Sequence, residues 1–94
     1  MEEAFSGQTY AVWNGGTNQA IKSRAGRLAK IIVYLNTTSG TLTVYDNPSA
    51  ASGTILFVSP AAPTSGTVYA LDMPARTGMY LVTPTGGAGI VVYS

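Results

Sequence analysis

Two aspartates are the first residues to consider for catalysis, because they are the only carboxylates outside the N-terminal pair Glu2–Glu3. Paired carboxylates carry out general acid and base catalysis, as in glycosidases. Asp46, however, stands in the turn-forming sequence Tyr45–Pro48, where an aspartate commonly bonds nearby backbone. Asp72 stands at the end of a strand-like segment, directly before Met73-Pro74. We therefore predict turn or ion-pairing roles for both aspartates.

The composition removes several other kinds of chemistry. The 94 residues include neither His nor Cys, so the chain has no imidazole base, no thiolate nucleophile, no disulfide and no zinc site of the usual nitrogen and sulfur type. A calcium site needs a loop of spaced carboxylate and carbonyl ligands, and the sequence contains no such loop. We expect a protein that is not an enzyme, with no catalytic residues, no metal and no cofactor.

Four of the five cationic residues fall within nine positions, at Lys22, Arg24, Arg27 and Lys30. Such a cluster contacts nucleic-acid phosphates or an acidic partner, or it keeps an exposed sheet edge from pairing with another chain. A net charge of +1 argues against nucleic acid, because modules that bind it carry a broad basic face. We therefore interpret the four cations as candidates for partner contact or edge protection.

Three aromatic residues near the N-terminus, Phe5, Tyr10 and Trp13, are further contact candidates. Exposed aromatic rings stack on sugars or on single-stranded bases. Tyrosine and tryptophan more often fill a core or a subunit interface, with the polar end of the ring at the rim. The sequence favours the core or interface interpretation, with a sugar-binding platform at Tyr10 and Trp13 as the alternative.

The elements that must position these residues are strands, because turn residues divide the chain into short β-branched segments without a helical period. Asn18–Ala25 is predicted to be an edge strand, although residues 20–30 could hold one helical turn, which Gly26 disfavours. The other predicted strands are Tyr10–Trp13, Leu28–Leu35, Thr41–Tyr45, Thr54–Val58, Thr67–Met73, Met79–Val82 and Ile90–Tyr93.

Seven or eight such strands predict an all-β fold, a single small two-sheet sandwich, with a jelly roll favoured over an immunoglobulin-like Greek key. We interpret residues 1–19 as an N-terminal segment that contains the first strand and serves as a contact arm, and residues 20–94 as the sandwich domain. Alternation along the strands predicts a set of inward-facing side chains. The set comprises Ile31, Val33, Leu35, Leu42, Val44, Tyr69, Leu71, Met73, Ile90 and Val92.

The surface is predicted to be unusually apolar. Only 10% of the residues are charged, against roughly 25% in an average globular chain. The segments Ile31–Leu35 and Ile55–Val58 are apolar on both faces, and a two-layer sandwich covers only one face of each strand. This surplus predicts subunit contacts and a homo-oligomer. The run Ile31–Leu35 is far shorter than the ~20 residues that cross a bilayer, and the acidic start lacks the features of a secretory signal, so we predict no membrane association.

Four segments together carry a family resemblance: Gly26–Leu28 leading into a β-branched strand, the turn sequence Thr38–Pro48, Leu71–Tyr80 with its Leu-Asp-Met-Pro motif, and the terminal Ile90–Ser94. Over about residues 20–94 the chain resembles short structural proteins of tailed bacteriophages. The resemblance implies a capsid decoration, or cement, protein: a small sandwich subunit without catalytic residues that binds the outside of an icosahedral shell between capsomers.

The same resemblance implies further properties of the protein. The partner would be the major capsid protein, and the location would be the capsid surface of the virion, after synthesis in the cytoplasm of the bacterial host. Two alternatives stay open from the sequence: a tail or fibre-associated β domain of the same virion, and a carbohydrate-binding module that uses Tyr10 and Trp13.

Overall fold

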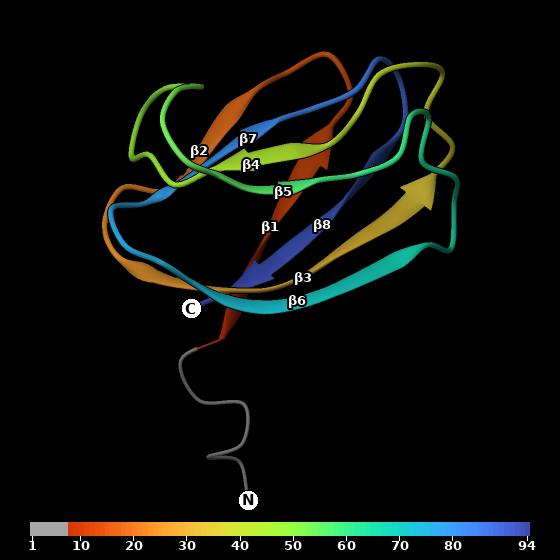
Figure 1. Cartoon of the computed structure of the whole chain (residues 1–94). Coiled ribbons are helices and arrows are strands. Elements are labelled where there is room, and N and C mark those ends of the chain that lie inside the picture. Colours follow the sequence, from red (N-terminus) through yellow and green to blue (C-terminus); the bar gives the residue numbers. More distant parts are fainter. Residues whose placement is uncertain (1–7) are drawn as a thin grey trace, which may run out of the picture.

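The computed structural model describes residues 8–94, and this part of the chain folds entirely into strands and connecting turns, without a helix (Figure 1). The all-β prediction is confirmed. Asn18–Ala25 holds an edge strand rather than a helical turn, because β2 lies at the edge of its sheet. The strands are β1 (Thr9–Asn14), β2 (Gln19–Lys22), β3 (Gly26–Leu35), β4 (Thr43–Tyr45), β5 (Ile55–Val58), β6 (Val68–Ala75), β7 (Met79–Val82) and β8 (Ala88–Tyr93).

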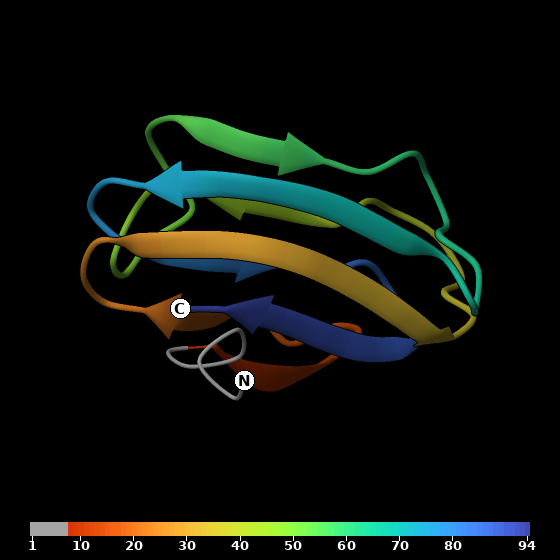
Figure 2. The same ribbon diagram turned by 90° about the horizontal axis from the view of Figure 1, so that it is seen from below.

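The strands form two antiparallel sheets of four, which face each other as the predicted sandwich (Figure 1). The first sheet has the order β1-β8-β3-β6, and the second has the order β2-β7-β4-β5. The pairing is nested: β1 pairs with β8, β2 with β7, β3 with β6, and β4 with β5. Consequently, every connection except β4–β5 crosses from one sheet to the other. Seen from below, β5 and β6 lie along one side of the sandwich (Figure 2).

Most of the predicted inward-facing residues do form the core between the sheets. Ile31, Val33, Leu42 and Val44 are buried, and the three predicted residues of β6 pack against them while partly buried. Leu35 is exposed, which makes that prediction wrong. A register shift between Val33 and Leu35 inserts an extra β3 residue opposite β8, and a bulge of this kind interrupts the alternation of faces.

The prediction for β8 is also wrong by one residue. Val91 is buried in the core, whereas Ile90 and Val92 face outward and lie outside the core cluster. All residues from Ile90 to Tyr93 are apolar, so their pattern alone could not choose between the two faces. The choice is made by β1, which pairs with β8 and has one large side chain to bury.

The large side chain that β1 buries is that of Trp13, which is 0% exposed. Trp13 pairs with Gly89 of β8, and a Cβ atom at position 89 would lie 2.6 Å from two carbons of the indole ring. The ring therefore occupies the space that a side chain at position 89 would fill. Its Nε1 is buried without a hydrogen-bond partner among the described residues, which is uncommon in native cores.

Candidate functional site

The outer face of the first sheet carries an extended apolar surface, which the strand registers define. Cross-strand partners in an antiparallel sheet share a face, so the registers place side chains in two rows that each cross all four strands. One row is Val12, Ile90, Ile32 and Val68, and the other is Tyr10, Val92, Lys30 and Ala70. We call these eight residues the outer patch.

The outer patch is open to solvent at its edges and partly covered at its centre. Tyr10 is 63% exposed, Val12 is 46% exposed and Val68 is 53% exposed, whereas Ile32 and Ile90 on the central strands are half-buried by their neighbours. A solvated face of an antiparallel sheet ordinarily carries polar side chains. Here one row is entirely aliphatic and the other contains a single cation, Lys30, which makes this face suited to contact with another protein.

The four predicted cations lie in three different places. Lys30 lies in the outer patch, and Arg27 lies on β3 and binds Asp72 of the neighbouring strand β6, with 2.8 Å between Nε and Oδ1. The prediction that Asp72 has an ion-pairing role is confirmed. Both side chains are more than half exposed, so the pair contributes little to stability. Asp72 has a φ of 45°, at an extra residue that β6 inserts opposite β3.

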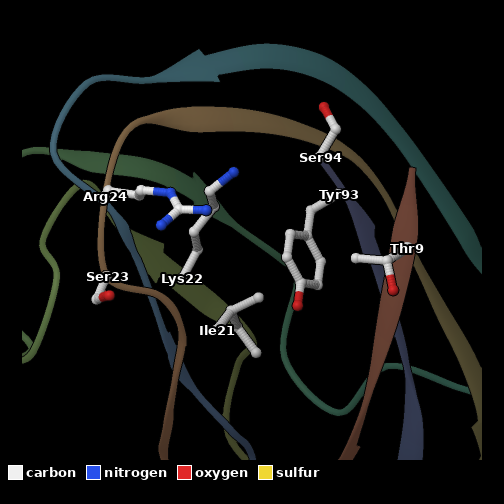
Figure 3. Close-up of a pocket in the computed structure, with 7 residues that line it drawn as sticks. All are labelled: Thr9, Ile21, Lys22, Ser23, Arg24, Tyr93 and Ser94. Carbon is white, nitrogen blue, oxygen red and sulfur yellow. The ribbon is translucent and has the colours of Figure 1, made fainter. Parts of the chain in front are cut away.

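Lys22 and Arg24 line a cleft of about 380 Å³ at the end of the sandwich where β2 passes into β3 (Figure 3). They share the cleft with Ile21 and Ser23 from their own segment, while Thr9 of β1 and Tyr93 and Ser94 at the end of β8 line its other part. The cleft combines two cationic groups, several hydroxyls and one aliphatic side chain. Such a lining suits an acidic side chain better than an apolar one.

Asp46 acts as a link between two distant turns. Its Oδ1 accepts hydrogen bonds from the backbone N–H of Arg76 at 3.0 Å and of Thr77 at 2.9 Å, and from the hydroxyl of Thr77 at 3.1 Å. Burial by itself raises the pKa of this carboxyl, but the hydrogen bonds from Thr77 and Arg76 outweigh it and bring the pKa below the ordinary value of 3.8. The prediction that Asp46 bonds the backbone of its own turn is wrong, because its partners lie 30 and 31 residues away along the chain. A carboxylate held ionised in this way is a structural group rather than a general acid.

The aromatic candidates do not form one platform. Tyr10 points out of the first sheet, whereas Trp13 points into the core, so the two rings lie on opposite faces of β1. Trp13 is thus a core residue and not part of a contact surface. Phe5 lies outside the described residues. The sequence did not reveal the outer patch, because Ile90 and Val92 were assigned to the core; the surplus of apolar residues in β3 was the only signal of it.

Comparison with known protein families, with curated proteins and with solved structures yields no match for this chain. Within residues 8–94, no helix is long and apolar enough to cross a membrane.

Proposed function

We propose that this protein is a capsid decoration protein of a tailed bacteriophage, which binds the outside of the icosahedral shell and stabilises it. It does so without catalysis, as an oligomer whose subunits contact the major capsid protein. The observation that carries the proposal is the outer patch, an apolar surface that crosses a whole sheet of a small, charge-poor protein. The resemblance of residues 20–94 to short phage structural proteins supplies the identity of the partner.

The outer patch supports binding to a large, repeated surface rather than to a small ligand. It is a sheet face without a described cavity, and its rows offer aliphatic and aromatic contacts of the kind that fill the centre of protein interfaces. A shell presents the same partner surface many times, so modest single contacts by a linked oligomer reach high occupancy. The cationic cleft at Lys22 and Arg24 supplies a second contact, suited to an acidic side chain of the partner.

The strand order is compatible with this role. Nested pairing of eight strands, from β1–β8 inward to β4–β5, supports a jelly roll, a topology that recurs in viral capsid and lectin domains. Because a fold hosts many functions, this support is by analogy only. The sugar-binding alternative loses its main argument, since Trp13 is buried and cannot stack on a ligand.

The copy number of the chain in purified virions tests the proposal. Quantitative mass spectrometry of the particles should give a ratio to the major capsid protein of the same order as one. A ratio far below one would move the protein to the tail, a fibre or a single vertex, and absence from the particles would refute a virion role.

A variant of the outer patch tests the surface itself. Val12→Lys places an ammonium group at the β1 end of the aliphatic row, and Ala20→Lys places the same group on an exposed β2 residue of the other sheet. Burying an unpaired charge costs more than the ~1.4 kcal/mol that a factor of ten represents. Val12→Lys should therefore weaken binding to purified shells at least about tenfold, while Ala20→Lys binds as the wild type does. Equal binding by both variants would place the contact elsewhere.

A further inference from the structure

The sandwich has four sheet edges, and they differ in how far they are protected from pairing with another chain. Proteins protect an edge strand with charges, prolines or bulges. The β6 edge has all three, in Asp72, Pro74 and the inserted residue opposite β3. The β2 edge ends in Lys22. The other two edge strands, β1 and β5, contain neither a charge nor a proline.

The β5 strand also lies in the longest uncharged part of the chain. No residue between Asp46 and Asp72 is charged, and β5 consists of four apolar residues within these 25 positions. Leu56 forms a bulge, because it is an extra β5 residue between Ile55 and Phe57, which pair with consecutive residues of β4. Ile55 and Val58 lie on the outer face and are 49% and 50% exposed. The bulge is therefore the only protection that β5 has.

The core is incompletely covered on the same side of the molecule. Phe57 of β5 and Tyr69 of β6 pack against each other from the two sheets, with ring centroids 5.0 Å apart. Both rings pack against the core, and so do Leu56 and Leu71, yet all four side chains keep part of their surface in solvent. On β1, by contrast, the core residue Trp13 is completely buried.

The backbone of β5 has hydrogen-bonding groups available on its free side. The N–H of Ser59 donates to the carbonyl of Leu42 at 2.8 Å, which directs the Ser59 backbone toward the segment that leads into β4. In an antiparallel ladder alternate residues point their N–H and C=O to opposite sides, so those of Val58 point away from β4. A further strand can therefore pair with this edge.

We propose that this free edge pairs antiparallel with β5 of a second copy of the chain. The β2-β7-β4-β5 sheets of the two copies then form one continuous sheet across a two-fold axis. An antiparallel strand pair is self-complementary, as a two-fold interface requires. Because residues 47–71 are uncharged, the two copies bring no like charges together.

This inference deepens the oligomeric part of the proposed function, and it can be tested without shells. The mass of the purified full chain, measured by light scattering over a concentration series, should rise toward that of a dimer. Val58→Lys should shift the midpoint of this rise at least about tenfold higher in concentration, because paired copies would bring two ammonium groups together in the interface. Ala20→Lys is the control, since Ala20 is an exposed residue outside the outer patch, on β2 at the opposite edge of the same sheet.

Each result bears on the pairing. A wild-type chain that stays monomeric throughout the series would overturn it, and so would an equal shift by both lysine variants. Circular dichroism confirms that each variant is folded, and Ile55→Lys replaces Val58→Lys if the latter is not. The chain has no cysteine, so a spin label at Val58→Cys gives an independent readout: a short inter-copy distance is expected there, and a long one at Ala20→Cys, because β2 lies at the far edge of the sheet. Dimers that fail to bind shells would leave this inference standing and refute the proposed function.

Discussion

The close contact between Trp13 and Gly89 predicts that Gly89→Ala destabilises the protein, whereas backbone conformational entropy alone predicts that it stabilises the protein. Gly89 does not have a left-handed φ, and at such a site Gly→Ala normally stabilises a protein by about 0.4–1 kcal/mol. Here the added Cβ would lie 2.6 Å from two indole carbons and still closer to the carbonyl oxygen of Ile32. Neither the buried ring nor the strand backbone can move away freely. We therefore expect Gly89→Ala to cost about 2 kcal/mol, within the range for overpacked cores.

Urea unfolding followed by circular dichroism measures this change. A loss of about 2 kcal/mol lowers the melting temperature of a domain of this size by roughly 8–16 °C. A double-mutant cycle with Trp13→Phe isolates the part that comes from the ring, because the smaller side chain leaves room for the methyl group. The steric argument fails if Gly89→Ala is as stable as the wild type or more stable, or if the cycle shows no coupling between the two positions.

Two further predictions concern the turns. Asp46→Ala should destabilise the fold by about 1–2 kcal/mol at neutral pH. Because the folded-state pKa of Asp46 is lowered, its contribution is present above the ordinary value of 3.8 and disappears as the pH falls below it, so unfolding curves of wild type and variant should converge in acid; a constant gap between them would contradict this. Ala62 has a φ of 50°, which is unfavourable for any residue with a Cβ, so Ala62→Gly should be about 0.5–1 kcal/mol more stable in the same assay. An unchanged or lower stability would show that this backbone strain is compensated.

Local sequence signals were sufficient for the strands and for several side chains. Runs of β-branched residues between turn residues marked each strand to within a few positions, because strand and turn propensities act over a few neighbouring residues. The same locality made the core positions of β4 and of the middle of β3 predictable. Leu42 and Val44 alternate with polar threonines, so the alternation indicated which face lies against the core.

Where the local pattern is uninformative, only the tertiary structure decided which side chains face the core. The run Ile90–Tyr93 is apolar at every position, so its inner face was chosen by the pairing of Gly89 with Trp13, which needs the space of a missing side chain. Leu35 faces solvent because the register shift against β8 occurs just before it. The sequence by itself determined the strands, the turns and the scarcity of charge. The tertiary structure determined which apolar side chains remained outside, because burial depends on partners that lie far away along the chain, and those exposed side chains make up the outer patch and the β5 edge.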